Sequence, residues 1–109
     1  MPEITDENAF EIIDGKLSKI EVKNYGNLGL TAQNMIFMMQ EDNMIDPSGL
    51  DVFKTELDSL VELVEKQLHD ECTSDTEHLE TTAFCEEFRR YMFGLYDKLK
   101  LELTQASTS

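Results

Sequence analysis

LDVFKTELDSLVELVEKQL, residues 50–68, is the stretch that decides the fold we predict for this 109-residue chain. Apolar residues recur in it three and four positions apart, which is the spacing of one face of an α-helix. This apolar stripe consists of Leu50, Phe53, Leu57, Leu60, Val61, Val64 and Leu68. Asp46 followed by Pro47 is typical of an N-cap and a first helical position. We therefore predict a helix over residues 47–71.

A second long helix is predicted after this one. Ser74 and Glu77 have the spacing of a capping box, in which two side chains satisfy free backbone N–H groups at the start of a helix. A further apolar stripe follows, made of Phe84, Phe88, Tyr91, Met92, Leu95 and Leu99. We predict a helix over residues 75–103 that runs antiparallel to the preceding one, and a flexible polar end over residues 104–109.

A shorter helix is predicted ahead of these two. Thr31 is a good N-cap residue after a glycine-containing loop, so we expect a helix over residues 31–42. Its centre, Met35 to Met39, is apolar on every face. Such a helix is either buried on all sides or partly given over to an interface.

The N-terminal residues predict a β-hairpin. Two short runs of apolar and polar residues flank Asp14-Gly15, which is a strong hairpin-turn signal. We predict a hairpin over residues 9–24 that packs on the helices, because a lone hairpin is marginal in water. Residues 1–8 are expected to be flexible. The predicted fold is mainly α (α+β), a single domain over residues 1–109 with a hairpin on three helices.

The charge of the chain is concentrated in its central part. The net charge is −14. Between Glu41 and Glu87 there are fifteen acidic residues against only Lys54 and Lys66. Such a field repels nucleic acid and membrane surfaces and attracts basic partners. The chain shows no export signal and no apolar run long enough to span a bilayer, so we expect a cytoplasmic protein with reduced cysteines.

Part of this acidity forms a row on the predicted helix 47–71. Asp51, Asp58, Glu62 and Glu65 share one face, where carboxylates four residues apart lie roughly 6 Å from each other. That spacing is similar to the spacing of phosphates along a nucleic-acid strand. We expect this row to contact a basic, nucleic-acid-binding protein, with Asp70, Glu71, Asp75 and Glu77 as further contacts. Solubility alone is the simpler explanation of the acidity.

In size, charge and lack of motifs, the chain resembles small phage-encoded acidic inhibitors. The resemblance is one of composition, and no stretch matches such a protein residue by residue. It implies an inhibitor or adaptor that works in the host cytoplasm and occupies the nucleic-acid site of its target.

A structural subunit or homo-oligomer is the alternative function. Methionine is flexible and frequent on adaptive binding surfaces, and four methionines lie within ten residues. The predicted oligomer surface combines Met35, Met38 and Met39 with Phe93 and Gly94, and Met44 belongs to the same methionine cluster. Gly94 would admit a close neighbour beside Phe93, either the predicted hairpin or another subunit. Core filling is the other explanation of these methionines, and a chance exposed aromatic is the other explanation of Phe93.

Catalytic and metal sites are not expected. A nucleophile needs a base within reach, and His69 and His78 are the only histidines and lie outside any nucleophile motif. These two histidines, Cys72 and Cys85 are a ligand set suited to zinc, but their spacing fits no zinc finger. We therefore predict a protein that is not an enzyme and that has no metal and no cofactor.

Overall fold

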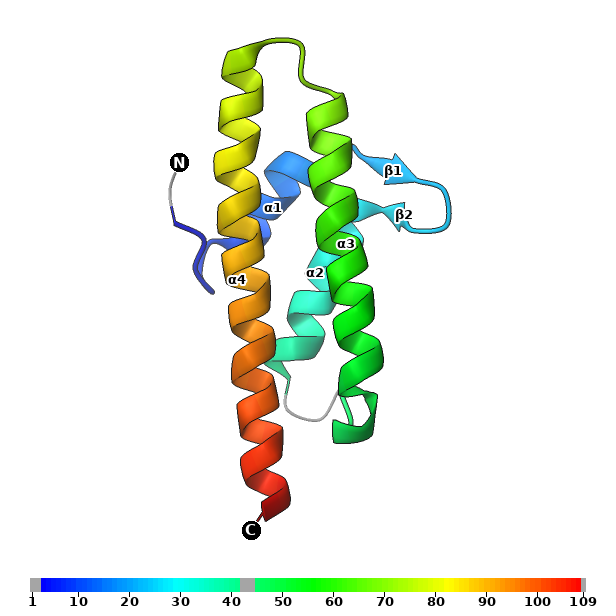
Figure 1. Ribbon diagram of the computed structural model, residues 1–109, viewed down its shortest axis with the longest axis vertical. Helices are drawn as coiled ribbons and strands as arrows, with labels where there is room; N and C mark the ends of the chain where they lie inside the picture. The colour runs from blue at the N-terminus through cyan, green and yellow to red at the C-terminus, as the bar shows by residue number, and fades with distance from the viewer. Residues whose placement is uncertain (1–2, 42–44, 109) are drawn as a thin grey trace.

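The computed structural model describes residues 3–41 and 45–108. In order, it contains α1 (Ala9–Leu17), β1 (Glu21–Val22), β2 (Gly26–Asn27), α2 (Leu28–Gln40), a 3-10 turn η1 (Pro47–Gly49), α3 (Leu50–Asp70) and α4 (Asp75–Thr108). In Figure 1, α3 and α4 run antiparallel side by side, α1 and α2 lie behind them, and the two strands project to one side. The predicted mainly α fold with a small antiparallel sheet is confirmed.

The apolar stripe of α3 packs into the core as predicted. Its residues from Leu50 to Val64 are buried, and Leu68 is partly buried where the helix approaches its end. On α4, Phe84, Phe88 and Met92 belong to the same buried core cluster as this stripe. Tyr96 is also buried, although it lies outside the predicted stripe. Burial of these side chains away from water is the main driving force that holds the two helices together.

The start of α4 is close to the predicted capping box. The Glu77 backbone N–H donates to the Ser74 hydroxyl oxygen at 3.2 Å. The Glu77 carboxylate accepts a hydrogen bond from the backbone N–H of Thr73 at 2.7 Å. In a capping box it would accept from the backbone N–H of Ser74, one residue later. The other end of α4 differs from the prediction, because the helix continues to Thr108 instead of ending at residue 103.

The short helix α2 begins three residues before the predicted start. Asn27 is its N-cap, since the Leu30 backbone N–H donates to the Asn27 side-chain oxygen at 2.9 Å. Thr31, the predicted cap, lies in the first turn, and its hydroxyl donates to the Asn27 carbonyl oxygen at 3.0 Å. The predicted C-terminal residue 42 of this helix lies outside the described residues.

The predicted hairpin over residues 9–24 is wrong. Residues Ala9–Leu17 form α1, and its buried residues Ala9, Ile13 and Leu17 are four positions apart. That helical spacing outweighs the Asp14-Gly15 turn signal, because it buries three apolar side chains on one face. A hairpin does form, but over residues 21–27, where Glu21 pairs with Asn27 and Val22 with Gly26.

The N-terminal segment from residue 3 to residue 8 contacts α4, although a flexible segment was predicted over residues 1–8. Ile4 is buried, with 1 % of its surface exposed. Its backbone N–H donates to the Glu87 carboxylate at 3.2 Å, and its carbonyl oxygen accepts from Arg90 at 2.9 Å. The segment from residue 3 to residue 8 is therefore fixed to α4 by an apolar anchor and by side chains of that helix.

Candidate functional site

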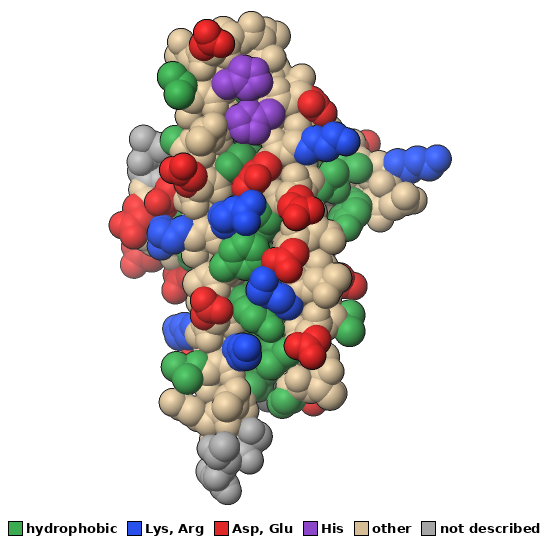
Figure 2. Space-filling view, viewed as in Figure 1, with side chains coloured by type: hydrophobic (Ala, Val, Ile, Leu, Met, Phe, Trp, Pro, Cys, Tyr) green, Lys and Arg blue, Asp and Glu red, His purple; other side chains and the backbone are tan. Residues whose placement is uncertain are grey.

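The predicted acidic row lies on α3, but it is partly neutralised within the chain. Asp58 forms an ion pair with Lys54 at 2.7 Å. Glu65 accepts two hydrogen bonds from Arg89 of α4, at 2.7 and 3.1 Å. Figure 2 shows the result, with basic and acidic side chains interleaved over this face of the molecule. The middle of the α3–α4 pair therefore does not present an unbroken row of negative charge.

The same cations cover Phe93, which the sequence placed on an oligomer surface. Lys54 lies over its ring at 4.5 Å from the centroid, and Arg89 lies over it at 5.7 Å. Phe93 is itself partly buried against the core. Gly94 beside it is exposed, and apart from its chain neighbours and the backbone of its own helix, an added Cβ would meet no described atom within 4 Å. The ring of Phe93 therefore makes cation–π contacts within the chain. The close neighbour predicted for Gly94 is not found among the described residues.

The methionines of α2 belong mainly to the core. Met35 and Met39 are buried, and Met38 is partly buried against the same core. Met44 lies outside the described residues. Core filling therefore explains Met35 and Met39, whereas Met38 keeps part of its surface exposed.

Negative charge is left uncompensated at the end of the α3–α4 pair. No lysine or arginine occurs from residue 67 to residue 88. Five carboxylate side chains are exposed at this end: Asp70, Glu71, Asp75, Glu77 and Glu80. Among the described residues, none of the five is within ion-pair distance of a lysine or arginine. We call this region, residues 69–80, the helical-hairpin end.

One carboxylate at the helical-hairpin end also serves the fold. The backbone N–H and the hydroxyl of Thr73 both donate to Glu77, and these hydrogen bonds lower the pKa of its carboxyl group. Glu77 therefore keeps its negative charge to lower pH than an isolated glutamate. Of the eight predicted contact residues, Asp70, Glu71, Asp75 and Glu77 lie together at this end.

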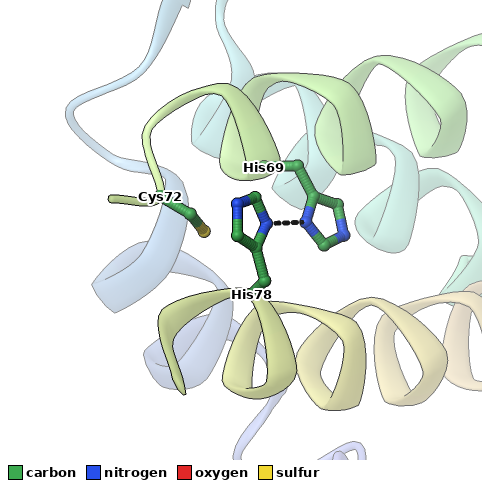
Figure 3. A group of neighbouring side chains, drawn as sticks. All are labelled: His69, Cys72 and His78. Carbon is green, nitrogen blue, oxygen red and sulfur yellow. Dashed lines mark hydrogen bonds between the residues drawn. The ribbon is translucent and has the colours of Figure 1, made fainter. Parts of the chain in front are cut away.

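Three side chains with nitrogen or sulfur ligand atoms also meet at the helical-hairpin end. His69 lies in the last turn of α3, Cys72 in the connection, and His78 in the first turn of α4. Figure 3 shows the two imidazole rings facing each other, with their Nδ1 atoms 3.0 Å apart. One ligand atom from each of the three residues lies within 4.8 Å of the others. The sequence indicated the same residues as possible ligands. Their meeting depends on the turn between α3 and α4, which places His78 beside His69.

Cys85, the second cysteine, is not part of this cluster. It is buried, and burial raises the pKa of its thiol to about 11, with a further contribution from the nearby Glu65 charge. A thiol that stays protonated at neutral pH is a poor nucleophile and a poor metal ligand. Cys85 belongs to the hydrophobic core cluster.

A hollow of about 400 Å³ lies between the N-terminal segment, α2 and α4. Asp6, Lys98 and Glu102 line it together with apolar side chains. Nearby, the Tyr91 hydroxyl donates to Asp6 at 2.8 Å and accepts from Gln40 at 3.3 Å. Burial and the Asp6 contact raise the pKa of Tyr91 well above its usual value. This tyrosine is therefore a fixed hydrogen-bond donor that ties the N-terminal segment to α4.

Comparison of the chain with protein-family models, with curated proteins and with solved structures found no match in any of the three. None of the helices in residues 3–41 and 45–108 is long and apolar enough to cross a lipid bilayer.

Proposed function

We propose that this chain is a non-enzymatic, acidic interaction protein that docks on a basic protein through its helical-hairpin end. The observation that supports this proposal most strongly is the charge arrangement of that end. Five exposed carboxylates lie within eleven residues, in a segment without lysine or arginine. Exposed and uncompensated charges of one sign steer a partner of the opposite sign and fix its orientation.

The acidic row on α3 contributes less in this proposal. Asp58 and Glu65 already have cationic partners in the chain, so a basic partner would have to compete with Lys54 and Arg89 for them. Asp51 and Glu62 are exposed and extend the negative surface along α3. The helical-hairpin end is the primary contact, and the row is an extension of it.

The partner class follows from the chemistry of the carboxylates. A basic surface that normally holds nucleic-acid phosphates offers lysine and arginine side chains to such groups. We therefore propose an inhibitor or adaptor of the small phage-encoded type, acting in the host cytoplasm by occupying such a surface. Nucleic acid and membranes are excluded as direct partners in this proposal, because their charge has the same sign as that of the chain.

The proposal is tested by removing charge without removing bulk. The first variant, Asp70→Asn/Glu71→Gln/Asp75→Asn, neutralises three carboxylates at the helical-hairpin end. The matched control, Glu7→Gln/Glu11→Gln/Asp14→Asn, neutralises three exposed carboxylates at and before α1. Both variants have the same net charge, so a difference between them reports the location of the contact and not the total charge.

The binding partner is first captured from a lysate of the encoding organism or its host at low salt, and then purified. Calorimetric titration should show a loss of affinity of about tenfold or more for the end variant and little loss for the control. Wild-type binding should weaken steeply as salt is added, and a nucleic acid bound by the partner should be displaced. Equal losses in both variants, or an affinity that does not change with salt, would contradict the proposal.

A further inference from the structure

The contact between His69 and His78 needs an electropositive atom between the two rings. Each Nδ1 of a neutral imidazole has either a proton or a lone pair. At 3.0 Å, two lone pairs facing each other would repel, so one Nδ1 carries a proton and donates it to the other in a hydrogen bond. The rings are nearly parallel, at an interplanar angle of 15°. Two nitrogens bound to one tetrahedral zinc ion at about 2.05 Å lie about 3.3 Å apart, which is close to the distance already present.

Cys72 adds the ligand type that distinguishes a metal site from a simple histidine pair. Its Sγ atom is partly buried and lies 3.1 Å from the Thr81 hydroxyl oxygen and 3.2 Å from the Leu68 carbonyl oxygen. When the thiol loses its proton, the Thr81 hydroxyl can donate to the sulfur. Outer hydrogen bonds of this kind orient metal ligands and stabilise their charge.

We propose that His69, Cys72 and His78 together bind one borderline-soft divalent metal ion of the zinc class. Imidazole nitrogen and thiolate sulfur are the ligands that such ions prefer. The ion takes the place of the thiol proton of Cys72, which is released to solvent. Both imidazoles stay neutral, and a proton that lay between them moves to the ring nitrogen that does not bind the ion. Three protein ligands leave a fourth position to water, because His78 is exposed to solvent.

The arrangement needs one adjustment to accept the ion. In Figure 3 the His78 ring lies between the sulfur of Cys72 and the ring of His69. The ring must turn so that one of its nitrogens and the sulfur point to the same place. His78 is the exposed member of the three, so this rotation is not opposed by packing.

The surrounding charge favours a cation at this position. Asp70 and Glu71 flank Cys72 on one side, and Asp75 and Glu77 precede His78 on the other. A field of this sign lowers the energy of a dication at the cluster. Carboxylates on their own prefer hard cations such as Mg²⁺ and Ca²⁺, so selectivity separates a histidine–cysteine site from binding to the acidic residues alone.

The site would tie α3 to α4 at the end where they are least held together. The hydrophobic core does not reach this end, since residues 73–80 are all exposed. A bound ion would connect the last turn of α3 and the first turn of α4 through two side chains. Metal binding should therefore raise the thermal midpoint of the chain, because an ion that binds the folded state shifts the unfolding equilibrium.

The test is a titration of the reduced, metal-free full chain with Co²⁺, a spectroscopic substitute for zinc. We expect one Co²⁺ per chain, visible bands of tetrahedral intensity and a near-ultraviolet thiolate-to-cobalt band. Zn²⁺ should displace the cobalt, whereas Mg²⁺ in large excess should not. Cys72→Ser should abolish the thiolate band, and His69→Gln and His78→Gln should each weaken binding about tenfold or more.

Two controls make the result specific. Cys85→Ser removes the other cysteine and should leave the thiolate band unchanged. The carboxylate variant Asp70→Asn/Glu71→Gln/Asp75→Asn should retain the band, so the metal site and the proposed docking surface can fail separately. A thiolate band that survives in Cys72→Ser, binding that is insensitive to both histidine substitutions, or no Co²⁺ binding at micromolar concentration would overturn the proposal. His78 is exposed, so its substitution leaves the fold intact and keeps the test valid.

Discussion

The middle and the end of the α3–α4 pair differ in how their charges are compensated, although both are acidic in sequence. In the middle, Glu65 is paired with Arg89, Asp58 is paired with Lys54, and the two cations lie over the ring of Phe93. At the helical-hairpin end, the carboxylates are exposed and have no lysine or arginine within the segment. The comparison shows that a high density of acidic residues in the sequence is not a measure of free negative charge on the surface.

The middle and the helical-hairpin end also differ in how tightly their side chains are packed. Phe84, Phe88 and Met92 are fully buried in the middle, whereas Leu79 at the end is 72 % exposed. Stability is therefore concentrated in the middle, and the end is free to take part in binding. The predictions below test this division, in order of decreasing expected effect.

The largest effect is expected for a core residue of the middle. Phe88→Ala should lower the free energy of unfolding by about 3–5 kcal/mol, because it leaves a cavity among buried side chains. Leu79→Ala at the end should change it by less than about 0.5 kcal/mol. Urea denaturation of both variants measures the contrast. Similar losses would show that the end is packed as tightly as the middle.

A smaller effect is expected at the N-cap of α4. Ser74→Ala removes the acceptor for the Glu77 backbone N–H, and loss of such a cap costs about 1 kcal/mol. The control is Ser48→Ala, since Ser48 is exposed in η1 at the other end of α3. Denaturant curves that show equal, negligible changes would contradict the capping role of Ser74.

The ion pair between the helices should contribute about 0.5 kcal/mol, because both partners are partly exposed. A double-mutant cycle with Arg89→Gln and Glu65→Gln measures this coupling free energy directly. The corresponding cycle between Arg89 and Asp70 should give a coupling near zero, since no ion pair connects these residues. Coupling of equal size in both cycles would mean that Arg89 also compensates the negative charge of Asp70 at the helical-hairpin end.

The smallest effect is expected in how the free energy of unfolding falls at acidic pH. The folded-state pKa of Glu77 lies below its ordinary value of 4.5, mainly because of the hydrogen bonds from Thr73. This contribution is present above the unfolded-state pKa and is lost as pH falls through the folded-state pKa. Glu77→Gln should therefore make stability less dependent on pH below about 4.5. An acid limb identical to that of the wild type would contradict the role of Glu77.

The sequence predicted the two long helices well because their signals are long and consistent. The stripe from Leu50 to Leu68 and the Ser74–Glu77 cap each agree with the observed elements. The N-terminal prediction failed because Asp14-Gly15 gives a strong local turn signal. The burial of Ala9, Ile13 and Leu17 depends on contacts with α2, which no local pattern shows.

The functional residues could be predicted only as candidates. The acidic row on α3 was found from its spacing, but its pairing with Arg89 depends on the register between α3 and α4. The meeting of His69 and His78 depends on the same register and on the length of the connecting turn. Neither is a property of a single helix, so spacing within a helix was insufficient to predict them.

The most direct test compares the end with the middle in a single measurement of affinity for the basic partner. Asp70→Asn/Glu71→Gln/Asp75→Asn removes three charges from the end, and Asp58→Asn/Glu62→Gln/Glu65→Gln removes three from the middle. We predict a loss of about tenfold or more for the end variant and less than about threefold for the middle variant. The opposite order would show that the row on α3, and not the helical-hairpin end, is the contact surface.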